Sequence, residues 1–193
     1  AGCDLGSEPR RETTTIVVTP AALSFDALQH SKALEVEVLD QNSRPMTDVD
    51  VSWSSRDPMV AQVTSAGVVT STGDGNTSVV AEAGSAKRTV SVSVFQLPAK
   101  LEVLAGDDQE GVAGELLPLK LRFRLEDRLG HPVEGAEISF TGLSGGGTVS
   151  PSPASTDPGG IAETEWRLGQ VALTPQVFLV SVVGAAHLST EIH

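Results

Sequence analysis

The chain has 193 residues, of which 25 are acidic and 13 are Lys or Arg, so its formal net charge is -12. This excess of negative charge repels phosphate backbones and anionic lipid headgroups, which excludes nucleic acid and lipid headgroups as partners of the folded part. Tyr is absent, and the 19 Gly and 11 Pro fall mainly between runs rich in Val, Thr and Ser. Such a composition is typical of an all-β chain.

Residues 1–14 predict a flexible leader, because they lack apolar periodicity and contain Gly, Ser, Pro and charged residues. The leader carries Cys3, the only cysteine, so no intrachain disulfide can form. Ala1-Gly2-Cys3 resembles the end of a bacterial lipobox, in which the cysteine is the site of lipid attachment. Two or more lipid chains on Cys3 would hold the protein at a membrane, whereas the alternative is an unmodified terminal cysteine.

Residues 15–96 predict a first domain built of short strands, because apolar runs recur there at intervals of roughly 8 to 12 residues. From Leu34 to Val38, apolar residues alternate with Glu35 and Glu37, which gives the strand one dry face. The seven expected strands are 15–19, 34–39, 49–54, 61–64, 68–71, 77–83 and 89–95. This number of strands fits a β-sandwich.

Residues 97–193 predict a second domain, because the segment around Pro98 interrupts the alternation and forms a short, stiff junction. The expected strands are 101–104, 117–127, 136–141, 160–168 and 177–183, with a glycine-rich turn at 145–147. Both halves share one spacing, in which Pro follows Asp by five residues and an aromatic residue follows eight later. The two sets are Asp40, Pro45 and Trp53, and Asp127, Pro132 and Phe140. The shared spacing indicates an internal repeat.

The first half contains the segments Val18-Thr19-Pro20, Val51-Ser52-Trp53-Ser54-Ser55-Arg56-Asp57-Pro58, Val60-Ala61-Gln62-Val63 and Ala66-Gly67-Val68-Val69. Through these segments it resembles the group 2 bacterial immunoglobulin-like domain. The second half contains Gly106-Asp107-Asp108-Gln109, Asp127-Arg128-Leu129-Gly130-His131-Pro132-Val133, Gly145-Gly146-Gly147, Thr156-Asp157-Pro158-Gly159-Gly160-Ile161-Ala162 and Trp166-Arg167-Leu168-Gly169. Through these segments it resembles the group 1 domain of the intimin and invasin type. The resemblance implies two tandem immunoglobulin-like β-sandwiches of a non-catalytic bacterial surface or periplasmic protein.

Three aromatic residues are candidates for the structural core. Trp53, Phe140 and Trp166 each occupy the inward phase of an alternating strand, where a large ring fills the space between two sheets. The alternative for the two tryptophans is an exposed platform for stacking a ligand. The interior position of both strands favours the core.

No catalytic or cofactor-binding residue is predicted, because no nucleophile lies in a recognisable motif with a base and Gly145-Gly146-Gly147 precedes no helix. No metal site is predicted either, since His30, His131, His187 and His193 have no metal-ligand spacing. Calcium is the alternative for the acidic residues, but Asp is also the ordinary residue of turns. The acidic residues concerned are Asp40, Asp74, Asp107, Asp108, Asp127 and Asp157.

These observations together predict a non-enzymatic, extracytoplasmic binding module with a protein partner and no small-molecule substrate. The expected role is an accessory subunit, tethered by lipid on Cys3, that docks on the periplasmic face of a membrane protein complex. A cell-surface adhesin or spacer is the alternative within the same class. A carbohydrate-binding module is the alternative from another class, although the chain has only 2 Trp, 5 Phe and no Tyr with which to build a sugar platform.

Overall fold

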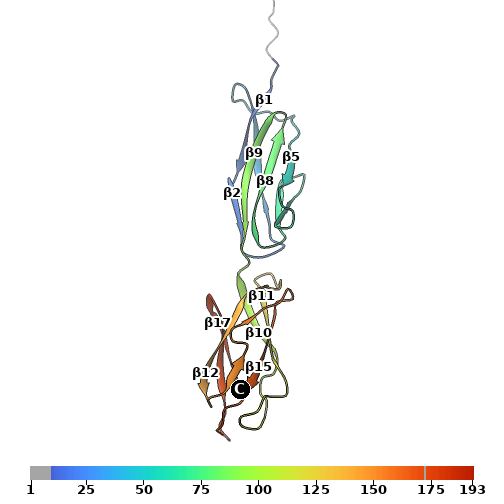
Figure 1. Cartoon of the computed structure of the whole chain (residues 1–193). Helices are drawn as coiled ribbons and strands as arrows, with labels where there is room; N and C mark the ends of the chain where they lie inside the picture. Colours follow the sequence, from blue (N-terminus) through green and yellow to red (C-terminus); the bar gives the residue numbers. More distant parts are fainter. Residues whose placement is uncertain (1–9, 172) are drawn as a thin grey trace, which may run out of the picture. The chain divides into compact units, whose positions relative to one another are not determined.

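The computed structural model describes residues 10–171 and 173–193, and all the regular structure in them is β-strand (Figure 1). The all-β prediction is therefore confirmed. The chain divides into two compact units, with the division between Phe95 and Gln96. Unit 1 here means the residues up to Phe95, and unit 2 means Gln96 to His193. Among the described residues, no helix has the length and apolar character needed to cross a bilayer.

Unit 1 is a sandwich of antiparallel strands with one parallel pair. Its strands are β1 (Thr13–Thr19), β2 (Ala22–Phe25), β3 (Ser31–Ala33), β4 (Glu35–Asp40), β5 (Ser52–Ser55), β6 (Ala61–Val63), β7 (Val68–Ser71), β8 (Gly75–Ala83) and β9 (Ala86–Val94). One sheet has the order β2-β9-β8-β5, and β1-β4 and β3-β7-β6 form two smaller sheets. The parallel pair is β2 with β9.

The core of unit 1 follows from the alternation in its strands. On β9, Val90, Val92 and Val94 are buried, whereas the serines between them face outward or lie at the boundary. The buried side chains of β8 and β9 meet those of β1, β2 and β7 in one apolar cluster. Two short strands, β2 and β3, were not predicted, because they form by pairing with β9 and β7 rather than from a pattern of their own.

Unit 2 is a sandwich of two four-stranded sheets. Its strands are β10 (Pro98–Ala105), β11 (Leu121–Asp127), β12 (Glu137–Ser144), β13 (Thr148–Ser150), β14 (Ala154–Ser155), β15 (Ile161–Arg167), β16 (Val177–Val182) and β17 (Ala185–Ile192). The sheets have the orders β10-β11-β15-β13 and β14-β12-β16-β17. Each sheet turns one row of apolar side chains inward, as the burial of alternate residues on β11, β15 and β16 shows.

Two aromatic pairs lie between the sheets of unit 2. The ring of Phe123 packs against that of Phe140 with centroids 5.5 Å apart. Trp166 and Phe178 meet edge to face, with centroids 5.3 Å apart and an interplanar angle of 84°. Each pair joins a residue of the β10-β11-β15-β13 sheet to one of the β14-β12-β16-β17 sheet, so the rings hold the two layers together.

In unit 1, the repeated Asp ends a strand and organises the turn that follows. Asp40 is 2% exposed. Its Oδ1 accepts hydrogen bonds from the backbone N–H groups of Asn42 and Arg44, and its Oδ2 accepts one of 2.7 Å from Arg11 Nε. Arg11 also donates to the carbonyl of Pro45. The side chain of Arg11 thereby links the segment just before β1 to the turn that follows β4.

Unit 2 contains the same arrangement, but a different side chain donates to the buried carboxylate. Asp127 is also 2% exposed, and its Oδ1 accepts from the backbone N–H groups of Leu129 and His131. Here Gln96 takes the place of the arginine, because its Nε2 donates to Asp127 Oδ2 at 3.0 Å and to the carbonyl of Pro132 at 2.9 Å. A neutral amide thus closes the turn in unit 2, and Gln96 is structurally part of that unit.

We expect the two units to unfold independently. Residues 10–95 and 96–193, made as separate proteins, should each show one cooperative thermal transition, because each contains its own core. Non-cooperative melting of both fragments would contradict independent unfolding.

In the second fragment, Gln96→Ala should lower the free energy of unfolding by about 1–2 kcal/mol, since the buried carboxylate of Asp127 loses a donor. Leu97→Ala is the control, because Leu97 is largely exposed.

The pKa of Asp40 provides a second test. The backbone N–H of Arg44 lowers this pKa below its ordinary value of 3.8, and the side chain of Arg11 and the N–H of Asn42 lower it further against an opposing effect of desolvation. A lowered pKa stabilises the folded state above the unfolded value, and this stabilisation is lost as the pH falls through the folded value. A carboxyl ¹³C titration should find the Asp40 midpoint below 3.8, and Arg11→Gln should raise it. An unchanged midpoint in the variant would remove Arg11 as a cause.

Candidate functional site

The structure places the residues predicted from the sequence as follows. Trp166 on β15 is 1% exposed and belongs to the core of unit 2. Phe140 on β12 is half-buried and packs against the same core. Trp53 on β5 is half-buried against the core of unit 1, and its ring lies close to the turn at Gly67. Cys3 lies outside the described residues.

Three of the acidic turn residues use their carboxylates locally. Asp40 and Asp127 accept backbone N–H groups as described above, and Asp157 Oδ1 accepts those of Gly159 and Ile161 at 2.8 and 2.9 Å. In residues 10–171 and 173–193, no three His, Cys, Asp or Glu side chains come together in an arrangement that could hold a metal ion. The carboxylates of these three turns therefore have a structural use, whatever else they do.

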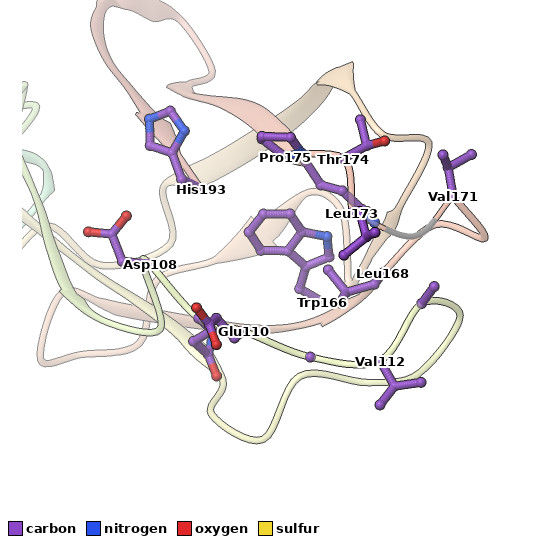
Figure 2. A pocket seen from close by; sticks show the side chains of 14 residues that line it. Asp108, Glu110, Val112, Trp166, Leu168, Val171, Leu173, Thr174, Pro175 and His193 are labelled. Carbon is purple, nitrogen blue, oxygen red and sulfur yellow. The ribbon is translucent and has the colours of Figure 1, made fainter.

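A cleft of about 820 Å³ lies at one end of unit 2. The segment 108–113, which follows β10, lines one side, and residues 171 and 173–176, before β16, line the other. Figure 2 shows the indole of Trp166 in the middle, with Asp108 and Glu110 on one side and Leu173, Thr174 and Pro175 on the other. Trp166 on β15 and Leu168, which follows the end of that strand, form the floor.

Apolar side chains line the cleft and are left open to solvent. Val112 is 65% exposed, Val171 is 59% exposed, and Leu173 is fully exposed. Large apolar side chains gathered around one concave surface are typical of contact sites. The cleft is therefore the strongest candidate for a binding surface in the described part of unit 2.

Hydrogen bonds hold the first wall of the cleft in place. Gln109 uses its side-chain amide to join two distant points of the loop, donating to the carbonyls of Gly106 and Leu119 and accepting from the N–H of Leu119. Further along, the N–H of Gly114 donates to the carbonyl of Gly169 at 3.1 Å. These hydrogen bonds hold the wall in one conformation.

The opposite wall and the end of β17 are held in a similar way. Gln176 is only 8% exposed, and its Oε1 accepts a hydrogen bond of 2.7 Å from the N–H of Gly169. At the other edge, the N–H of His193 donates to Asp107 Oδ1 at 2.7 Å, and the N–H of Asp108 donates to the carbonyl of His193 at 2.9 Å. These bonds connect the loop after β10 with the last strand.

The floor contains a donor without an acceptor. Nε1 of Trp166 is buried and has no hydrogen-bond partner within the described residues. Gly147 lies close to the edge of the indole, and a side chain would not fit there. An added Cβ would lie 2.8 Å from Trp166 Nε1 and 2.7 Å from Gln176 Oε1. The glycine-rich turn predicted from the sequence therefore covers the edge of the indole rather than a phosphate.

Charge is distributed unevenly between the cleft and the sheet beside it. On the outer face of β10, β11 and β15, cations and carboxylates pair with one another, as do Arg122 and Glu163 at 2.8 Å and Lys100 and Glu102 at 2.9 Å. The loop from 106 to 116 contains four carboxylates and no Lys or Arg. Among the described residues, the exposed side chains of Asp108 and Glu110 form no ion pair, so the rim of the cleft is negative.

Sequence reasoning did not find this cleft. It noted Asp107 and Asp108 in the resemblance to the intimin and invasin type and as possible calcium ligands, and it predicted a strand from Leu117, whereas β11 begins at Leu121. The available signal was a run from Gly111 to Leu119 that is apolar but does not alternate. In the structure, this run is a loop in which only Leu117 is buried.

Comparison with known proteins gives structural similarity only. No protein-family model and no curated protein sequence matches the chain. Invasin, a bacterial integrin-binding protein, is similar with a TM-score of 0.55 and 19% identity, over 92% of this chain and 38% of invasin. The Yersinia pseudotuberculosis adhesin InvE gives 0.49 and 14%, over 92% of this chain and 57% of InvE. Domains 5–6 of the S-layer protein SbsC give 0.41 and 18%, over 95% of this chain and 97% of that one.

The similarity to invasin shows the fold, which is that of tandem immunoglobulin-like β-sandwiches. The chain spans less than two thirds of the length of InvE and of invasin. The similarity transfers no binding residue, because the fold alone does not determine function.

The floor of the cleft can be tested by two substitutions at one position. Trp166→Ala should lower the free energy of unfolding of unit 2 by about 3–5 kcal/mol, because it leaves a large cavity between the sheets. Trp166→Phe should cost much less, about 1–2 kcal/mol, since it keeps most of the apolar ring and removes an N–H that has no acceptor. Chemical denaturation measures both. Equal losses in the two variants would mean that the indole N–H has a partner after all.

Proposed function

We propose that the chain is a non-catalytic, extracytoplasmic module that binds another protein while a lipid on Cys3 holds it at a membrane. The expected host is a membrane protein complex, on whose periplasmic face the chain acts as an accessory subunit. The observation that supports protein binding best is the cleft of unit 2, where exposed Val112 and Leu173 face solvent beside unpaired carboxylates. Invasin, which shares the fold, is itself a protein-binding protein.

The distribution of aromatic side chains favours protein over sugar as the ligand. All seven Phe and Trp residues of the chain lie in its described part, and Phe95 is the only one of them that is exposed. Sugar-binding platforms usually need exposed aromatic rings that lie side by side. A carbohydrate-binding module therefore has little support.

Tethering matters because it determines how strong the docking must be. The seven residues between Cys3 and Arg11, which bonds to Asp40, would keep the folded units within a few tens of Å of the bilayer. Anything in the same membrane is then at an effective concentration in the millimolar range, so that a weak contact is enough for stable association. This argument favours an accessory subunit over an outward-reaching adhesin or spacer, which needs length rather than proximity.

The lipid anchor is tested on the native protein in its own cells. Mass spectrometry should find acyl chains on the cysteine, and the protein should fractionate with membranes. Cys3→Ser should move it to the soluble fraction while leaving the thermal transitions of both units unchanged, because Cys3 precedes the first strand. An unmodified cysteine on a wild-type protein found in the soluble fraction would contradict the anchor.

A further inference from the structure

The cleft of unit 2 combines two features that together define the chemistry of its occupant. Val112 and Pro175 are exposed, Leu168 is half-buried, and all three line the cleft. Asp108 and Glu110 stand at the same cleft, and within the described residues neither has a cationic partner. An occupant that matches both features is apolar at its centre and positively charged beside it.

Other occupants fit these features less well. The negative rim repels phosphate and anionic lipid headgroups, and a net charge of -12 disfavours the docking of a second copy of the chain. Small-molecule sites are mostly enclosed and carry convergent polar groups. Here the wall residues Val112 and Leu173 stand open to solvent, as expected for a surface on which a chain segment lies.

Building on the proposed role in protein binding, we propose that this cleft receives an extended segment of the partner protein in which Lys or Arg flanks an aliphatic side chain. The aliphatic side chain packs against Val112, Leu168 and Pro175. The flanking cation lies beside Asp108 and Glu110, so the contact weakens as salt rises.

The geometry of the walls supports this assignment. Gln109 and Gln176 fix the two loops through their side-chain amides, so little conformational freedom remains to be lost on binding. A short peptide should therefore bind the cleft without a large rearrangement. Its dissociation constant is expected to be on the order of 1 mM, which is enough for a tethered protein.

The first experiment uses defined peptides and the full-length protein. The probe is acetyl-Gly-Ser-Lys-Leu-Val-Lys-Ser-Gly-amide, and the controls replace both Lys with Glu or replace Leu-Val with Ser-Ser. Trp53 and Trp166 are the only tryptophans, so ¹⁵N-labelled protein gives one indole resonance for each unit. The Lys-Leu-Val-Lys peptide should shift the Trp166 resonance and leave that of Trp53 unchanged. Neither control peptide should do so.

Matched variants then test the two halves of the proposal. Asp108→Asn with Glu110→Gln should weaken binding about three- to tenfold, as expected for two exposed ion pairs. The matched control is Glu134→Gln with Glu137→Gln, which removes the same charge at the start of β12, away from the cleft. It should leave the affinity for the peptide unchanged. Val112→Ser tests the apolar wall and should weaken binding as well. All three proteins should keep the wild-type melting temperature, because the substituted side chains are exposed.

Four results would overturn the proposal. The first is the absence of any Trp166 shift with the Lys-Leu-Val-Lys peptide, and the second is an equal shift with the Glu peptide. The third is a larger shift with phosphatidylglycerol vesicles, which would assign the cleft to lipid. The fourth is concentration-dependent self-association that Val112→Ser abolishes, which would assign the cleft to a second copy of the chain.

A cross-linking experiment in native membranes separates failure of the cleft from failure of the proposed function. A photoreactive amino acid at Val112 should attach to a partner peptide that contains an aliphatic residue beside Lys or Arg. The control position is Val183, an exposed valine just after β16, at the end of that strand away from the cleft. Adducts at Val183 alone would overturn the cleft and leave protein binding standing, whereas no adduct at either position would count against both.

Discussion

The carboxylate buried at the end of a strand is the interaction on which both units depend. Asp40 and Asp127 each hold a turn through two backbone N–H groups and receive one side chain from the segment that begins the unit, Arg11 or Gln96. A buried carboxylate without donors is costly, so the turn and the entering segment both stabilise the strand end by supplying donors. Through this contact, the first strand region of each unit is joined to a strand that follows about thirty residues later.

The two units make this contact with different side chains, a charged one in unit 1 and a neutral one in unit 2. Arg11 provides a permanent charge, whereas Gln96 provides only a dipole, so salt should weaken the contact of Arg11 with Asp40 more than that of Gln96 with Asp127. Because Gln96 is the residue that immediately follows unit 1, the start of unit 2 is fixed by a hydrogen bond rather than by apolar packing. The junction of the chain therefore belongs to the structure of the second unit.

Binding capacity is concentrated where the strands end. The outer face of the β10-β11-β15-β13 sheet carries ion pairs such as Arg122 with Glu163, and paired charges attract little. At the cleft, the loops leave Val112 exposed and the carboxylates of Asp108 and Glu110 without cations among the described residues. A rigid sandwich with a fixed loop pair at one end is well suited to hold a segment of another protein, since loops on rigid scaffolds commonly carry recognition.

By itself, the sequence determined the fold class and the repeat of Asp, Pro and an aromatic residue, because strand alternation and turn chemistry are local properties. It did not distinguish the fully buried Trp166 from the half-buried Trp53, since the degree of burial depends on which strands face a ring. It also missed β2 and β3, which are held by pairing with β9 and β7 rather than by their own pattern. In the second half it missed β13, β14 and β17, which pair with β15, β12 and β16. The cleft depended on tertiary structure alone, because its walls come from loops about sixty residues apart, which are joined by the bond from Gly114 to Gly169.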